Sequence, residues 1–252
     1  MKKIINKILN TLGYNIRKID KNFKGNDFPI EISKDEKKII EISEKYSMSG
    51  RLRMWSLIQS VKYIIDNKIE GDLVECGVWR GGNLILMQQL INRYKINKRI
   101  YGFDTFEGMS KPKEIDVDYE GRSAIEMLSN SKKKNDLPDI WAYCDIETVK
   151  KNILNSVNSN NITLVKGKVE NTLLLKKNLP DKISILRLDT DWYESTKTEL
   201  EILYPKLSKN GVLIIDDYGH FMVCKKAVDE YFKNYKPWFH YIDYTCRLLI
   251  KK

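Results

Sequence analysis

The chain has 252 residues, with 44 Lys and Arg against 34 Asp and Glu, and a formal net charge of +10. This length suits one large α/β domain with its own core and is too short for two full-sized domains. Asn6, Lys7 and Asn10 interrupt the apolar N-terminal run, which argues against a membrane span and against a signal peptide. The four cysteines form no C-x-x-C pair, so we expect free thiols in a reducing cytoplasm.

Residues 1–33 are expected to form a basic N-terminal arm. Residues 1–24 hold seven basic residues and one acidic residue, so most of the net charge lies there. A helical stripe joins the apolar side chains near the start, with lysines opposite: Ile4, Ile5, Ile8, Leu9 and Leu12. Two alternatives follow. Residues 1–14 contact an anionic membrane surface, or the helix is a packed arm or an oligomer contact.

Residues 34–70 are expected to form helices that pack on the core. Ser33 has the residue type and position of an N-cap, and a second helix is predicted from about Leu52 to Asn67. From residue 71 to 252 we expect a single domain, because short apolar runs there alternate with helical segments. The five runs are D-L-V-E-C-G-V, R-I-Y-G-F-D-T, I-T-L-V-K-G-K, I-S-I-L-R-L-D and G-V-L-I-I-D-D-Y. This rhythm predicts a parallel, doubly wound sheet.

Two features depart from that rhythm. Residues 107–143 are rich in Gly, Pro and Lys and form a long insertion, which predicts a lid or specificity loop. Near the end, W-F-H-Y-I-D-Y-T-C-R-L-L-I-K predicts two strands that turn at Asp243 to Thr245. This pair is expected to close one edge of the sheet in the antiparallel sense, which makes a mostly parallel sheet of seven strands.

Two of the apolar runs end in aspartates. One closes on Asp189 and Asp191, and the next closes on Asp216 and Asp217. If the two strands are neighbours, four carboxylates meet at one edge, where a positive group must hold them together. Hard oxygen ligands of this kind suit Mg²⁺ or Ca²⁺. The alternative is that these aspartates cap the helices that follow.

A glycine turn follows the first run of the domain. The stretch E-C-G-V-W-R-G-G leads into a helix, and its Gly77 and Gly81 allow a tight turn and close backbone approach. The N-terminus of the helix favours an anionic group. The spacing G-x-x-x-G after Glu75 differs from the G-x-G-x-x-G of dinucleotide enzymes, which favours S-adenosylmethionine over NAD. Asp104 ends the second strand, where it is expected to bind ribose hydroxyls or, alternatively, to serve as a turn or N-cap residue.

The predicted cofactor-binding residues lie in or beside these two strand ends: Glu75, Gly77, Arg80, Gly81, Asp104 and Thr105. Trp192 and Tyr193 are the preferred candidates for a wall of the substrate site, and their alternative role is packing. His220 follows the Asp216–Asp217 pair directly, so it is a candidate for substrate contact or for an alternative base. Its other interpretation is an exposed loop residue.

Several stretches together resemble the macrocin-type sugar O-methyltransferases (TylF/MycF-like). They cover about residues 46–250 in the family's order: G-D-L-V-E-C-G-V-W-R-G-G, Y-G-F-D-T-F-E-G-M, V-K-G-K-V-E-N-T-L, L-R-L-D-T-D-W-Y-E-S-T and Y-P-K-L-S-K-N-G-V-L-I-I-D-D-Y-G-H. The resemblance implies a class I methyltransferase fold with a Rossmann-like sheet, S-adenosylmethionine as methyl donor, Mg²⁺, and transfer to a sugar hydroxyl. It also favours a homo-oligomer.

The resemblance further implies that Asp189, Asp216 and Asp217 are the metal ligands and that Asp191 is the general base. Consecutive strand residues face opposite ways, so Asp216 and Asp217 can both bind one ion only if the strand has already ended. Asp189 and Asp191 can point the same way if the chain stays extended. Asp191 has an equally good alternative as the N-cap of the next helix.

The function predicted from the sequence is a cytoplasmic, Mg²⁺-dependent O-methyltransferase acting on a sugar in surface glycan or natural-product biosynthesis. Nucleic acid is not expected as its partner. One alternative is a glycosyltransferase, because D-T-D also matches the D-x-D motif that holds a metal and a nucleotide diphosphate. The other is a non-enzymatic basic binding module, suggested by the arm.

Overall fold

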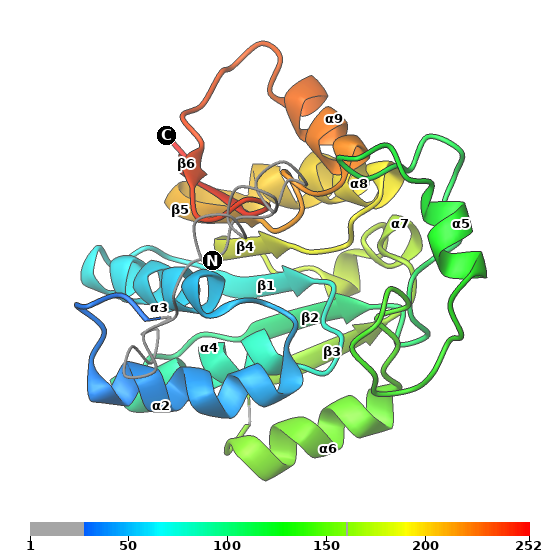
Figure 1. The fold of residues 1–252 in the computed structure, drawn as a ribbon. Helices are drawn as coiled ribbons and strands as arrows, with labels where there is room; N and C mark the ends of the chain where they lie inside the picture. The colour runs from blue at the N-terminus through cyan, green and yellow to red at the C-terminus, as the bar shows by residue number, and fades with distance from the viewer. Residues whose placement is uncertain (1–27, 160) are drawn as a thin grey trace, which may run out of the picture. The chain divides into compact units, whose positions relative to one another are not determined.

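The computed structural model describes residues 28–159 and 161–252 (Figure 1). The predictions for the basic N-terminal arm, including residues 1–14, therefore lie outside the described residues. Residues 28–31, which belong to the unit Met1–Glu31, contain a bend and a turn. The second unit, Ile32–Lys252, contains all the elements below. Within the described residues, no helix has the length and apolarity needed to cross a membrane.

Seven strands form one sheet in the order β3-β2-β1-β4-β5-β7-β6 (Figure 1). Their bounds are β1 Asp72–Cys76, β2 Ile100–Asp104, β3 Ile162–Lys166, β4 Ile183–Leu188, β5 Leu207–Ile215, β6 His240–Tyr241 and β7 Arg247–Ile250. The first five strands are parallel, and β7 runs antiparallel to both β5 and β6. The predicted mostly parallel sheet with an antiparallel edge is therefore confirmed.

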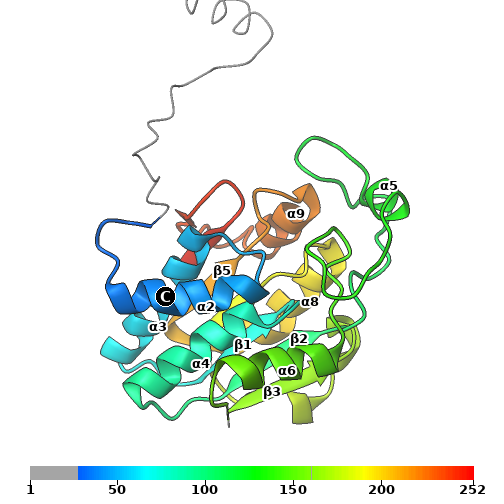
Figure 2. The same ribbon diagram turned by 60° about the horizontal axis from the view of Figure 1, so that its bottom comes forward.

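Helices cover both faces of this sheet. On one face lie α2 Lys34–Ser43, α3 Arg51–Asp66, α4 Gly82–Tyr94 and α6 Ile146–Ser156 (Figures 1 and 2). On the other face lie α7 Val169–Thr172, α8 Tyr193–Leu203 and α9 Met222–Tyr231. The central strand β4 is buried along its whole length, as expected for a parallel strand covered by helices on both sides.

The order of the strands reverses beside β1, because β2 pairs on one side of it and β4 on the other. In open α/β sheets a ligand binds beyond the carboxyl ends of the strands at such a reversal. The glycine turn and both aspartate pairs follow β1, β4 and β5 at these ends. The topology therefore brings the predicted site residues to one edge.

The insertion at 107–143 lies between β2 and α6 and contains one short helix, α5 Ala124–Ser129, which projects at the side of the sheet in Figure 1. An antiparallel bridge joins Asp118 in this segment to Phe221 after β5. The segment is thereby tied to the loop that follows the second aspartate pair. Its role as a lid stays a prediction, as does the division of the chain at residues 33 and 70.

The first described helix, α2, begins with the predicted N-cap. Ser33 Oγ accepts a hydrogen bond from Glu36 N at 3.2 Å, and the Glu36 carboxylate accepts one from Ser33 N at 2.8 Å. The two bonds form a capping box that satisfies backbone donors at the start of the helix. The helix buries Ile39 and Ile40, so the cap fixes an element that belongs to the core.

We expect Ser33→Ala to lower the free energy of unfolding by about 1 kcal/mol, because an N-cap hydroxyl is lost. Ser33→Asp is the matched control, since aspartate caps a helix as well as serine does. Urea unfolding followed by circular dichroism measures both changes. Equal stability of Ser33→Ala and the unchanged protein would contradict the role of the cap.

Candidate active site

The turn after β1 is shaped by two glycines in the left-handed region. Gly77 has φ +84° and Gly81 has φ +90°. A Cβ placed on Gly77 would lie 1.8 Å from the carbonyl oxygen of Asp189, so a side chain is excluded there. The turn after β1 therefore lies directly against the chain after β4, where the first aspartate pair begins.

Asp104 holds the same turn from the end of β2. Its Oδ2 accepts hydrogen bonds from the backbone N–H of Val78 at 2.7 Å and of Trp79 at 3.0 Å, and its Oδ1 accepts one from Phe106 N. Burial raises the pKa of Asp104, and these backbone bonds oppose that rise. The glycine turn after β1 and the end of β2 are thus fixed to each other by one carboxylate.

A cavity beyond the ends of β1 to β4, which we name the turn cavity, collects residues from four strand ends. Asp104 and Thr105 line it together with Trp79 of the glycine turn. The remaining lining follows β2, β3 and β4: Gly108, Met109, Ser110, Ala142, Gly167, Lys168, Val169, Glu170, Asp189, Thr190 and Ser195. Its position is that of a nucleotide-type ligand in an open α/β sheet.

A buried arginine, Arg187 of β4, links the carboxylates of three strands. Its side chain donates to Glu75 of β1 at 2.9 Å and also reaches Asp189 and Asp216. Glu75 and Arg187 are 1% and 2% exposed. Burial raises the pKa of Glu75 to about 8, against the pull of Arg187. Glu75 also accepts a hydrogen bond from Asn83 at 2.9 Å, so it lies beneath the glycine turn and outside the lining of the turn cavity.

Asp216 faces this arginine and a second one. One oxygen of its carboxylate pairs with Arg187, and the other pairs with Arg53 of α3. The Nε atom of Arg53 lies 3.1 Å from Asp243 in the turn between β6 and β7. Asp216 therefore belongs to a mixed cluster of acids and arginines in which positive and negative groups alternate.

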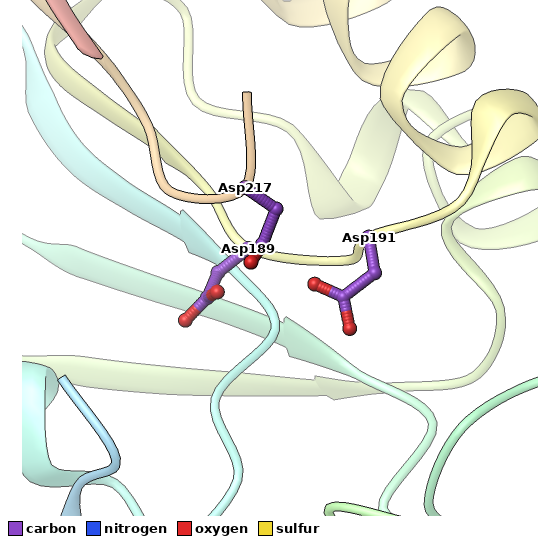
Figure 3. A group of neighbouring side chains, drawn as sticks. All are labelled: Asp189, Asp191 and Asp217. Carbon is purple, nitrogen blue, oxygen red and sulfur yellow. The ribbon is translucent and has the colours of Figure 1, made fainter. Parts of the chain in front are cut away.

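A second group of carboxylates, which we name the aspartate trio, consists of Asp189, Asp191 and Asp217 (Figure 3). One carboxylate oxygen from each lies within 4.8 Å of the others. Burial, together with neighbouring negative charge, raises the pKa of Asp189 and of Asp217 well above the usual range, and it raises the pKa of Asp191 to about 7. The predicted ligand set of Asp189, Asp216 and Asp217 shares two members with this trio, and Asp191 takes the place of Asp216.

The strand β5 ends at Ile215, one residue before the aspartate pair. Asp216 and Asp217 are thus outside the strand, which is the condition for both of them to bind one ion. Their side chains nevertheless have different neighbours, since Asp216 meets arginines and Asp217 meets aspartates.

Asp191 reaches the trio through a left-handed backbone, with φ +66°. The chain from Asp189 to Asp191 is therefore not extended, and the two carboxylates approach each other through a turn instead. The N-cap alternative for Asp191 is wrong, because α8 begins at Tyr193 with Trp192 at the N-cap position and has no side-chain cap. The tight turn at Asp191 turns its carboxylate back toward Asp189.

A second cavity, the carboxylate cavity, has a volume of about 320 Å³ and contains the aspartate trio and Asp216 in its lining. Two residues, Trp79 and Asp189, line both cavities. The other walls come from the loop before α3, α3 itself, the glycine turn, α4, the insertion and the chain after β5: Ser47, Met48, Ser49, Arg53, Val78, Asn83, Asp139, Ile140, His220, Phe221, Tyr244 and Thr245.

Aromatic rings stand at one side of the carboxylate cavity. The ring of His220 lies 5.5 Å from that of Tyr119 and 6.0 Å from that of Tyr244, measured between centroids. Tyr119 is 51% exposed and Tyr244 57% exposed. Burial lowers the pKa of His220, which favours its neutral imidazole.

Three predicted contact residues have other neighbours. Trp192 is 4% exposed, and its indole N–H donates to Ser110 O at 3.2 Å. Tyr193 donates its hydroxyl to Glu230 of α9. Arg80 pairs with Asp136 of the insertion. Neither Trp192 nor Tyr193 lines the two cavities, and for Trp192 the packing alternative fits the observed burial.

Other residues of the site were not assigned a role from the sequence. Arg187 carried a signal, because a single arginine inside an otherwise apolar strand must be paired when it is buried. Residues 167–170 line the turn cavity. They directly follow β3, so they lie at the carboxyl edge of the sheet like Asp104 at the end of β2. Arg53, Tyr119 and Tyr244 carried no local signal, since only the tertiary fold brings them to the site.

The strand order, the glycine turn after β1 and the acidic ends of β4 and β5 define a class I methyltransferase. The chain belongs to the macrocin O-methyltransferase (TylF) family, whose model matches residues 24–248. It is an S-adenosylmethionine-dependent O-methyltransferase, as the sequence predicted. The family membership sets aside the glycosyltransferase and the non-enzymatic binding module.

Individual relatives agree with this family. Demethyldecarbamoylnovobiocin O-methyltransferase of Streptomyces niveus is 34% identical over 189 residues, which are 74% of this chain and 67% of the relative. The 8-demethyl-8-(2,3-dimethoxy-alpha-L-rhamnosyl)-tetracenomycin-C 4'-O-methyltransferase of Streptomyces olivaceus is 31% identical over 192 residues, 75% of this chain and 68% of the relative. Among solved structures, the O-methyltransferase NovP superposes with a TM-score of 0.69 at 31% identity, covering 82% of each chain.

Two glycines with similar backbone angles allow a matched test of the turn. Gly121 has φ +80° and open space where a Cβ would lie, whereas a Cβ on Gly77 would meet the Asp189 carbonyl. We expect Gly121→Ala to lower the free energy of unfolding by about 1 to 2 kcal/mol through backbone strain alone. Gly77→Ala is expected to lower it by about 3 kcal/mol or more, because a steric clash is added. Urea unfolding measures the loss of stability in both variants. Equal losses would contradict the close approach of the turn after β1 to the chain after β4.

Proposed function

We propose that this O-methyltransferase moves the methyl group of S-adenosylmethionine to a sugar hydroxyl, with Mg²⁺ at the aspartates after β4 and β5. The observation that carries the proposal is that Asp189 and Trp79 line both cavities. A methyl donor in the turn cavity and an acceptor in the carboxylate cavity would meet beside Asp189. The proposal thus accounts for two cavities that share one wall.

The donor is proposed to occupy the turn cavity. Asp104 and Thr105 line it at the position where ribose hydroxyls would find an acceptor, and the glycine turn leaves room for close approach of a ligand. Gly77 and Gly81 act through the shape of the turn, and Glu75 acts from beneath it. Arg80 supports the site through Asp136 of the insertion, which makes its predicted cofactor contact indirect.

A divalent cation fits the aspartate trio. Asp217 Oδ2 is buried without a hydrogen-bond partner among the described residues. The raised pKa values of Asp189 and Asp217 reflect burial first and then the negative charge of neighbouring carboxylates, Asp216 among them for both. Carboxylate oxygens are the ligands that Mg²⁺ takes in proteins, usually one or two together with water and substrate oxygens. When bound, the ion would act as a Lewis acid that lowers the pKa of a coordinated hydroxyl.

Asp189 and Asp217 are proposed as ligands on both the sequence and the geometry. Asp216 stays the proposed third ligand from the family resemblance, although both of its oxygens pair with arginines here. Asp191 is proposed as the general base beside these ligands. It would take the hydroxyl proton while the oxygen attacks the methyl carbon, the S–CH₃ bond breaks and S-adenosylhomocysteine leaves. His220 is the second candidate for this proton.

A sugar acceptor is proposed from the relatives and from the walls of the carboxylate cavity. The two named relatives act on novobiocin and tetracenomycin intermediates, and the second name specifies a rhamnosyl group. The exposed rings of Tyr119 and Tyr244 beside His220 offer flat apolar faces, against which the C–H face of a sugar can pack. Natural-product biosynthesis is accordingly the proposed setting. The homo-oligomer and the membrane contact stay predictions from the sequence.

Removal of one proposed ligand tests the metal site. We expect Asp217→Asn to weaken Mg²⁺ binding by about tenfold or more, because an anionic oxygen ligand becomes a neutral amide. The affinity of this variant for S-adenosylhomocysteine should stay within about threefold of that of the unchanged protein, since the turn cavity is intact. Calorimetric titration measures it in Mg²⁺ and then in EDTA. Asp66→Asn, at an exposed position of α3, is the control. Unaltered Mg²⁺ affinity in Asp217→Asn would reject Asp217 as a ligand.

The proposed base is tested by a separate variant. We expect Asp191→Asn to lower the rate of methyl transfer to a panel of glycosides by about 10² to 10⁴, the usual contribution of a general base. Mg²⁺ affinity should stay close to that of the unchanged protein. A fall in Mg²⁺ affinity like that of Asp217→Asn would make Asp191 a ligand instead, and a larger rate loss in His220→Gln would move the base to His220.

A further inference from the structure

Glu199 is a buried acid that the proposed mechanism does not use. It lies in the middle of α8 and is 0% exposed. A buried carboxyl group is costly unless its polar contacts compensate for the lost water. Its side chain accepts a hydrogen bond from the Thr190 hydroxyl at 2.9 Å, and the Cys76 thiol at the end of β1 is its second polar neighbour.

Thr190 stands between the two aspartates that converge with Asp217. Its hydroxyl is held by Glu199, and its carbonyl oxygen accepts hydrogen bonds from Trp192 N at 2.8 Å and from Ser195 Oγ at 3.3 Å. These contacts attach the side chain and the backbone of Thr190 to the beginning and the middle of α8. These contacts restrict rotation of both the side chain and the backbone of Thr190.

The next residue, Asp191, has the left-handed backbone that turns its carboxylate toward the trio. A non-glycine residue is destabilised by about 1 to 2 kcal/mol in that conformation. Such a conformation persists only where the surrounding contacts determine it. Among the contacts that can do so are the side-chain contact of Asp191 with Asp217 and, from the preceding residue, those of Thr190.

We infer that Glu199 is a positioning residue, which holds Thr190 and thereby keeps Asp191 turned toward Asp189 and Asp217. The inference rests on the proposed Mg²⁺-dependent methyl transfer for its consequence in function. Burial raises the pKa of Glu199 well above its usual range, in keeping with an acid that serves as a hydrogen-bond partner inside the core. Thr190 also lines the turn cavity, so the same contact lies at the boundary of both cavities.

The test compares Thr190→Val, Glu199→Met, the two together, and Glu199→Gln. Initial rates measure methyl transfer to a panel of glycosides at saturating S-adenosylmethionine and Mg²⁺, and urea unfolding in EDTA measures stability. We expect each of the first two variants to lower the rate by about tenfold, because Asp191, the proposed base, is no longer held toward Asp189 and Asp217. The double variant should be no slower than the slower single variant, because both substitutions remove the same bond.

Glu199→Gln should keep the rate of methyl transfer within about twofold, since its amide oxygen can accept the same hydrogen bond from Thr190. Thr198→Val is the matched control, because the Thr198 hydroxyl donates to Glu194 O at 2.8 Å within the same helix. Loss of stability in Glu199→Met with an unchanged rate of methyl transfer would overturn the inference and leave Glu199 as a packing residue. Additive effects of the two substitutions would overturn it as well. If Glu199→Met does not fold, Thr190→Val, at a partly exposed position, decides alone.

A crystal structure of Thr190→Val separates this inference from the proposed function. If the unchanged protein binds no Mg²⁺, the metal proposal fails, but the conformation of Asp191 can still be compared. An Asp191 that leaves the left-handed region and turns away from Asp217 supports the positioning role. An Asp191 that keeps both its φ and its place beside Asp189 and Asp217 overturns the role, whatever the metal result.

Discussion

The arrangement of the active site depends on how negative charge is tolerated at one edge of the sheet. Arg187 contacts carboxylates from the ends of β1, β4 and β5, and it is almost completely buried. A buried charge is stable only when it is paired and hydrogen-bonded, and here each partner needs the other. A single guanidinium group therefore connects Glu75, beneath the glycine turn, with Asp216, which lies beside the aspartate trio. The donor side and the acceptor side of the site share this support.

The same constraint divides the two adjacent aspartates after β5. Asp216 faces Arg187 and Arg53, so its charge is largely compensated by the protein itself. Asp217 faces Asp189 and Asp191 and has a buried oxygen without a partner among the described residues. An added cation gains most where negative charge is least compensated, and that place is the aspartate trio. The arginines thus leave less uncompensated negative charge at Asp216 than at the trio, where the proposed cation would gain most.

The sequence was sufficient for the sheet and for most of the strand ends that carry the site. Periodic apolar runs and the glycine spacing depend on local chemistry, and the Ser33 cap follows from residue type alone. The directions of side chains beyond the strand ends were not predictable in this way. The turn of Asp191 needs a left-handed backbone fixed by α8, and the partners of Asp216 include Arg53, 163 residues away in the chain. Trp192 packs in the core against Phe221 and donates to Ser110 of the insertion, neighbours that no local pattern reveals.

The proposed donor site and the proposed acceptor site are closest where the two cavities share a wall. Gly77 lets the turn after β1 approach the Asp189 carbonyl so closely that no side chain fits between them, and Asp189 and Trp79 border both cavities. In-line methyl transfer requires the attacking oxygen directly behind the methyl carbon, and small displacements of bound reactants reduce the rate strongly. A shared wall of this kind allows that approach, whereas a side chain on Gly77 would displace the chain at Asp189 and with it that wall. The glycine is thus required by the proposed reaction as well as by the turn.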